Sequence, residues 1–143
     1  MKRHTLIHSG VAVDNLHRYN VVIGTDLGQF SGTVTCREED YDHESKFFGF
    51  ELAELKAEIE YARAKKKKYL TELKALRIFG RDMAQTRTYD ANAFWVKQLH
   101  SRTAELEGKV KDWTQHVKWL QAAYYARILE RDALNKKREA RGL

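Results

Sequence analysis

The apolar positions of this chain change their period near residue 47. Before that point, residues 19–24 form a compact β-branched run, and residues 29–36 alternate between two kinds of position. A period of two is typical of a strand that buries one face. Beyond residue 47, apolar residues recur every three or four positions, which is typical of helices. The pattern predicts an α+β fold in which the strands come first.

The first 40 residues predict a small antiparallel sheet. Residues 25–28 (TDLG) have the composition of a tight turn, because Gly28 can take a positive φ at no steric cost. The flanking segments then form a hairpin, and an earlier strand around residues 4–13 adds to it. Two or three short strands cannot bury a core by themselves. We therefore expect the sheet to pack on the helices that follow it.

The first helix is predicted over residues 47–79. Its apolar residues step by three, four or seven, as in a heptad seam, with a polar interruption at Lys66. The acidic residues 37–46 precede it and supply candidate N-caps. Gly80 is expected to end the helix. The seam residues are Leu52, Leu55, Ile59, Ala62, Tyr69, Leu73 and Leu76.

The second helix is predicted over residues 91–138, with Asp90 as its N-cap and Thr103 in a seam position. A connector over residues 80–90 would join the two helices into an antiparallel, coiled-coil-like α-hairpin. We expect residues 1–143 to form a single domain. The apolar stripe of this helix consists of Leu99, Leu106, Val110, Trp113, Val117, Leu120 and Tyr124.

The second helix is expected to outrun the first by about 20 Å, at about 1.5 Å per residue. Its far apolar residues then need a cover from outside the hairpin. A second copy of the chain is the simplest cover, because symmetric homodimers are the commonest oligomers. We therefore predict a homo-oligomer, a homodimer or higher. The residues concerned are Trp119, Tyr124, Tyr125, Ile128 and Leu134.

Composition excludes several classes of protein. Cys36 is the single cysteine among the 143 residues, so neither a disulfide framework nor a cysteine-built zinc site is expected. No stretch approaches the ~20 apolar residues of a membrane span. We expect a cytoplasmic protein without a membrane partner, in the host cytoplasm if a phage encodes it.

The net charge of +6 is uneven along the chain. Residues 1–46 hold 5 Lys/Arg and 7 Asp/Glu, hence −2, whereas residues 47–143 hold 21 and 13, hence +8. A basic surface attracts phosphates in nucleotides, nucleic acids or membranes. Lysine-rich soluble helices produce the same balance without any such partner.

Motifs for catalysis, metals and cofactors are missing from the sequence. We find no Ser–His–Asp, GxSxG, HExxH or Walker-type pattern. The carboxylates of residues 40–51 have the spacing of a calcium-binding loop, but Ser45 occupies the position at which that loop requires glycine. The six histidines show no ligand spacing. We expect a protein that is not an enzyme and holds no metal or cofactor.

The start of the second helix is the best candidate for ligand binding. Free N–H groups at a helix N-terminus, together with arginines, an amide and aromatic rings, suit a phosphate and a stacked base. An alternative is that Phe94 and Trp95 plug the hairpin against the sheet. The candidate ligand-binding residues are Arg81, Arg87, Tyr89, Asn92 and Phe94.

The densest positive run is Lys65, Lys66, Lys67 and Lys68. Four consecutive residues cover every face of a helix, so Lys66 must lie at or near the seam, from which its stem can snorkel. The run is either a phosphate-contacting, nucleic-acid-binding patch or a solvated helix with a gap in its coiled coil.

Residues 29–63 resemble small phage-encoded proteins that carry an FxGxAxC strand, an acidic loop and a glycine-led helix start. A small sheet followed by two long helices is also similar to the phage Thoeris anti-defence proteins. The resemblance implies a non-enzymatic, oligomeric sponge that sequesters a cyclic ADP-ribose-type signal in pockets at subunit junctions. Alternatives are an anti-CRISPR-like inhibitor of a host defence nuclease and a basic coiled-coil nucleic-acid-binding protein. The matching residues are Phe30, Gly32, Val34, Cys36, Glu39, Asp40, Tyr41, Asp42, Gly49, Leu52 and Ala53.

Overall fold

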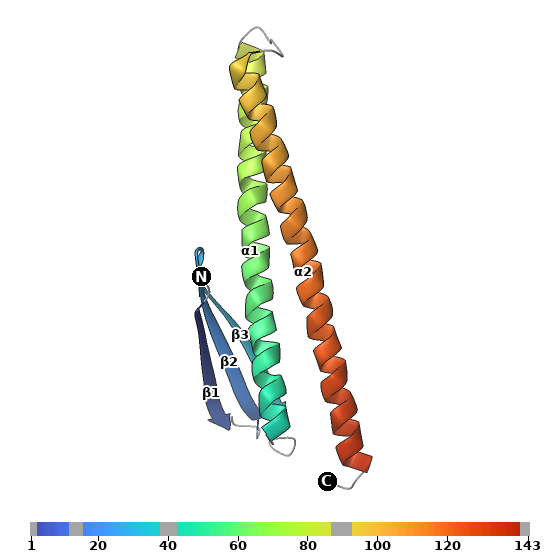
Figure 1. Cartoon of the computed structure of the whole chain (residues 1–143). Coiled ribbons are helices and arrows are strands. Elements are labelled where there is room, and N and C mark those ends of the chain that lie inside the picture. Colours follow the sequence, from blue (N-terminus) through green and yellow to red (C-terminus); the bar gives the residue numbers. More distant parts are fainter. Residues whose placement is uncertain (1–2, 12–15, 38–42, 87–92, 141–143) are drawn as a thin grey trace. The chain divides into compact units, whose positions relative to one another are not determined.

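The computed structural model describes residues 3–11, 16–37, 43–86 and 93–140. Three strands precede two long helices, so the predicted α+β order is confirmed (Figure 1). The elements are β1 (Arg3–Val11), β2 (Leu16–Thr25), β3 (Gly28–Arg37), α1 (His43–Thr86) and α2 (Phe94–Ala140).

The strands form one antiparallel sheet in the order β1-β2-β3. Thr25 pairs with Gly28 across the β2–β3 turn, and Gly28 has a φ of 111°. The Thr25 hydroxyl accepts a hydrogen bond from the Leu27 N–H (3.1 Å) and donates one to the Gly28 carbonyl oxygen (2.7 Å). The predicted hairpin and its glycine are therefore confirmed, because only glycine takes this backbone conformation without strain.

Contacts divide the chain into two units. The sheet unit comprises residues 1–61 and 117–143, so it contains the sheet, the start of α1 and the end of α2. The helical unit comprises residues 62–116 and holds the end of α1 and the start of α2.

In the sheet unit, α1 lies against β2 and β3 at two glycines (Figure 1). A Cβ added to Gly32 would overlap the carbonyl oxygen of Ala53 and lie 2.7 Å from the backbone nitrogen of Ala57. A Cβ on Gly49 would overlap the ring of Tyr19. The close approach buries the inward face of β2, where the alternating side chains Tyr19, Val21 and Ile23 are fully buried. This explains the strand period seen in the sequence.

The helices contact each other within the sheet unit in an antiparallel sense. The Arg127 guanidinium lies 4.5 Å from the ring centre of Phe48 and forms an ion pair with Glu51. One turn earlier in α2, the Tyr124 ring lies 5.8 Å from Nζ of Lys56. As the residue number falls in α2, the contacted residue number rises in α1.

The helical unit shows the same antiparallel pairing. Nη2 of Arg77 lies 3.1 Å from Oε1 of Glu107, and Nη2 of Arg102 lies 3.3 Å from Oε2 of Glu72. The heptad seams supply the interior, which includes the buried residues Leu73, Val96 and Leu106.

All four predicted helix ends differ from the structure, although α2 ends only two residues late, at Ala140 rather than residue 138. α1 begins at His43 rather than residue 47 and continues through Gly80 to Thr86. Gly80 therefore does not end the helix. A Cβ there would lie 2.7 Å from Cδ2 of Leu99, so the glycine makes room for that side chain. α2 begins at Phe94 rather than residue 91. The expected cap Asp90 and most of the connector lie outside the described residues.

Candidate ligand-binding pocket

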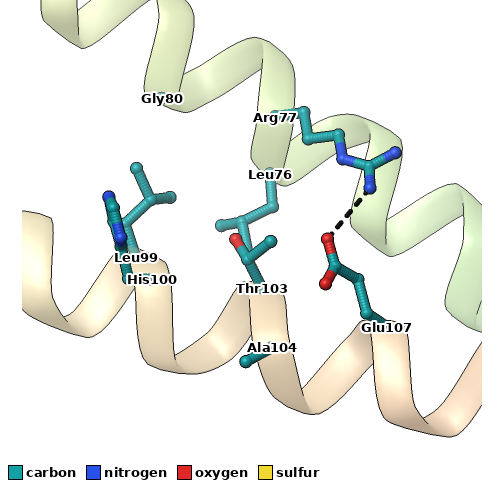
Figure 2. Close-up of a pocket in the computed structure, with 8 residues that line it drawn as sticks. All are labelled: Leu76, Arg77, Gly80, Leu99, His100, Thr103, Ala104 and Glu107. Carbon is teal, nitrogen blue, oxygen red and sulfur yellow. Dashed lines mark hydrogen bonds and ion pairs between the residues drawn. The ribbon is translucent and has the colours of Figure 1, made fainter.

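A pocket of about 470 Å³ opens between α1 and α2 in the helical unit. Three of its lining residues come from α1 and five come from α2 (Figure 2). Its volume lies within the usual range of small-molecule sites. The lining residues are Leu76, Arg77, Gly80, Leu99, His100, Thr103, Ala104 and Glu107.

Small residues line the pocket at the seam. Gly80 has no side chain, and Thr103 occupies a seam position that neighbouring heptads fill with larger apolar residues. Figure 2 shows Leu99 pointing toward Gly80 and Leu76 pointing toward Thr103. Leu76 and Leu99 provide apolar surface beside the hydroxyl of Thr103. The pocket therefore combines apolar contact area with a few polar groups, as binding sites for small molecules do.

The ion pair between Arg77 and Glu107 borders the pocket (Figure 2). Both side chains are more than half exposed. An exposed pair of this kind contributes only about 0–1 kcal/mol, so a competing anion can replace the carboxylate at little cost. The guanidinium carries five N–H donors in a planar fork that matches a phosphate group.

A second, more open hollow of about 350 Å³ shares Leu76 with the pocket. In this hollow the arginine comes from α2 and the glutamate from α1, because Arg102 forms an ion pair with Glu72. Arg102 also holds the pKa of Glu105 below its ordinary value through a hydrogen bond and its positive charge. Because the pKa of Glu105 is lower in the folded protein than in the unfolded chain, its ionisation stabilises the fold. This contribution is fully present above the pKa of the unfolded chain and is lost as the pH falls through the pKa of the folded protein.

Positive charge is concentrated in the helical unit. Residues 62–116 hold 13 Lys/Arg and 6 Asp/Glu, which gives +7, and the rest of the chain therefore carries −1 of the total +6. A field of this sign raises the local concentration of anions and speeds their association. The pocket therefore lies in the more positively charged part of the chain.

The lysine run divides into buried and exposed members. Lys65 is only 8% exposed, and its Nζ lies 5.7 Å from the ring centre of Tyr69 and 6.0 Å from that of Trp113. Lys66 is half-buried, whereas Lys67 and Lys68 are exposed. The most buried lysine is therefore Lys65 rather than Lys66, because two aromatic faces receive its ammonium group.

Only two of the five predicted ligand-binding residues are described. Arg81 and Phe94 are exposed, and neither lines the pocket. Phe94 is 74% exposed, which contradicts its alternative interpretation as a buried plug. Arg81 directly follows the lining residue Gly80 and lies one turn beyond Arg77. The remaining three, Arg87, Tyr89 and Asn92, lie outside the described residues.

Sequence reasoning missed most of the pocket. Two residues of the sequence point to it, Thr103 in the seam and Gly80, but a glycine after a helical pattern is also typical of a helix C-terminus. His100 and Glu107 carried no signal, since single polar residues on a helix surface are common.

Within the described ranges, no group of three or more His, Cys, Asp or Glu residues could hold a metal ion. Neither described helix contains a segment long and apolar enough to cross a bilayer. No protein-family model, curated protein or solved structure matches this chain.

Proposed function

We propose that the chain is a non-enzymatic phage anti-defence protein that sequesters a cyclic nucleotide signal of the cyclic ADP-ribose type. The observation that supports this proposal best is the pocket of about 470 Å³ between α1 and α2, bordered by Arg77 in a unit of net charge +7. The resemblance to the Thoeris anti-defence proteins supplies the ligand class. That resemblance implies pockets at subunit junctions, whereas we place the nucleotide between two helices of one chain.

The polar groups of the pocket suit a pyrophosphate and a ribose. A phosphate would replace the Glu107 carboxylate on Arg77, because it carries more negative charge and can accept two parallel hydrogen bonds from the guanidinium fork. The Thr103 hydroxyl and the His100 ring can hydrogen-bond ribose hydroxyls.

The apolar groups of the pocket suit a nucleobase. Leu76 and Leu99 offer hydrophobic area to one face of the ring. Burying apolar area contributes about 25 cal/mol per Å². Sequestration needs tight, stoichiometric binding and no bond cleavage, so these contacts are sufficient for the proposed role.

Reversing the charge of Arg77 tests this placement. Arg77→Glu should weaken the binding of cyclic ADP-ribose at least about 100-fold, because it removes charge-assisted hydrogen bonds worth about 1.5–3 kcal/mol and adds repulsion. Isothermal titration calorimetry measures the loss. Lys74→Glu is the matched control, since Lys74 is exposed, lies on the same helix and does not line the pocket. Equal affinities of Arg77→Glu and wild type would contradict the proposed site.

A nucleic-acid-binding function is the second candidate, supported by the exposed Lys67 and Lys68 in the basic helical unit. It predicts retention on heparin and an affinity that falls steeply with salt. Replacing both lysines by glutamine should then reduce the retention. Under the sponge proposal, the same double variant binds the cyclic nucleotide as wild type does, so the two functions are distinguishable.

A further inference from the structure

The end of α2 carries a second apolar stripe in the sheet unit. Trp119 and Leu129 are 64% and 69% exposed, and three alanines between and beyond them are also exposed. The spacing is 3, 4, 3 and 4, which is a heptad seam. The stripe consists of Trp119, Ala122, Ala126, Leu129 and Ala133.

The stripe lies on the face of α2 opposite the one that contacts α1. At about 100° per residue, its mean direction is about 150° from the direction shared by Tyr124, Arg127 and the buried Leu120. A helix that is apolar on two opposite faces needs two partners to bury both. The start of α1 supplies the first.

The stripe is complementary to itself. When two copies of α2 run antiparallel about a two-fold axis near Tyr125, Trp119 faces Leu129 of the partner subunit and Ala122 faces Ala126 of the partner subunit. A large residue then meets a large one, and the alanines meet at the centre, where small side chains allow the helices to approach closely.

The charges beside the stripe fit the same register. Lys118 and Asp132 are exposed and flank the stripe on the side of Tyr125. In the antiparallel arrangement Lys118 lies opposite Asp132 of the partner subunit, and Tyr125, which is 65% exposed, lies opposite its own copy. Because of the two-fold axis, the dimer contains two such Lys–Asp contacts. In a parallel in-register arrangement these flanking residues would not meet as opposite charges.

We infer that this stripe is the interface of a homodimer in which two copies of α2 pair antiparallel about Tyr125. The occupant is a second copy of this chain, because both the side-chain sizes and the flanking charges are complementary under the same two-fold operation. The interface spans about two heptads, so the dimer forms reversibly with concentration. This inference does not depend on the proposed nucleotide function.

Sedimentation equilibrium from about 5 to 200 µM tests the register through charge swaps. Lys118→Asp and Asp132→Lys should each raise the dimer dissociation constant roughly five- to tenfold, because each creates two like-charge contacts. The double variant should return it to within about threefold of wild type. A double variant that dimerises as weakly as the single variants would overturn the antiparallel register.

A glutamate on the stripe tests the interface itself. Ala126→Glu should leave only monomer over the same concentrations, because it places a charge at the centre of the apolar contact. Ala84→Glu, at an exposed alanine of α1 in the helical unit, should leave the dimer intact. Helix content from circular dichroism should match wild type for both variants, which keeps a loss of dimer separate from unfolding. A wild-type protein that is monomeric throughout, or an Ala126→Glu variant that still dimerises, would overturn the inference.

Discussion

Replacing Gly32 by valine should destabilise the sheet unit by about 3 kcal/mol or more. Any Cβ at this position overlaps the carbonyl oxygen of Ala53 and crowds the backbone nitrogen of Ala57. Both obstacles are backbone atoms of α1, so no rotamer change can relieve the clash and the helix must move off the sheet. The contacts that bury Tyr19 and Ile23 would be lost with it.

Urea denaturation followed by circular dichroism measures this effect. Gly108→Ala is the matched control, because Gly108 is an exposed glycine inside α2 and a Cβ there meets nothing within 4 Å. That control should gain up to about 1 kcal/mol through helix propensity. A Gly32→Val variant as stable as wild type would show that α1 does not pack directly on β3.

Leu106→Ala should cost about 2–5 kcal/mol in the helical unit, the second-largest effect we expect. Leu106 is 1% exposed and lies in the seam beside the hollow that adjoins the pocket. Removing its side chain enlarges the hollow that Leu106 already lines, so little of the lost contact can be recovered. Thermal unfolding should show a clearly lowered midpoint.

Leu129→Ala provides the comparison on the same helix. Leu129 is largely exposed, so the same chemical change should alter stability by no more than about 0.5 kcal/mol at protein concentrations where wild type is monomeric. Equal losses for Leu106→Ala and Leu129→Ala would contradict the assignment of the inner and outer faces of α2.

Local patterns predicted much of the fold. The alternation over residues 29–36 and the turn at Gly28 identified the hairpin, because side-chain period and positive φ are properties of single segments. The heptad steps identified both helices and most of their inner residues, including Leu52, Leu73 and Leu120. These features depend on short-range geometry, which one sequence contains.

The helix end at Gly80 and the pocket depend on pairing between segments. Glycine often ends a helix, but here Leu99 of α2 fills the space beside Gly80, and only the relative register of the two helices shows this. The same register brings Arg77 to Glu107 and places Thr103 in the pocket. The heptad pattern of each helix does not determine which small residue of α1 lies opposite which small residue of α2.

The burial of Lys65 could not be predicted from the sequence for a related reason. Periodicity pointed to Lys66 as the interruption of the seam. In the structure, Tyr69 and Trp113 offer ring faces to Lys65 instead. A cation–π contact across two helices outweighs the position that the heptad assigns.

Sequestration without turnover is tested most directly by binding and release. The purified protein is incubated with less than one equivalent of cyclic ADP-ribose and filtered, and the retained protein is then denatured by heat. Mass spectrometry quantifies the nucleotide in the filtrate and in the heat-released fraction. We predict that wild type retains the nucleotide and releases it intact, whereas Arg77→Glu leaves it in the filtrate. Nucleotide that passes through with wild type, or returns as a cleaved product, would contradict the account.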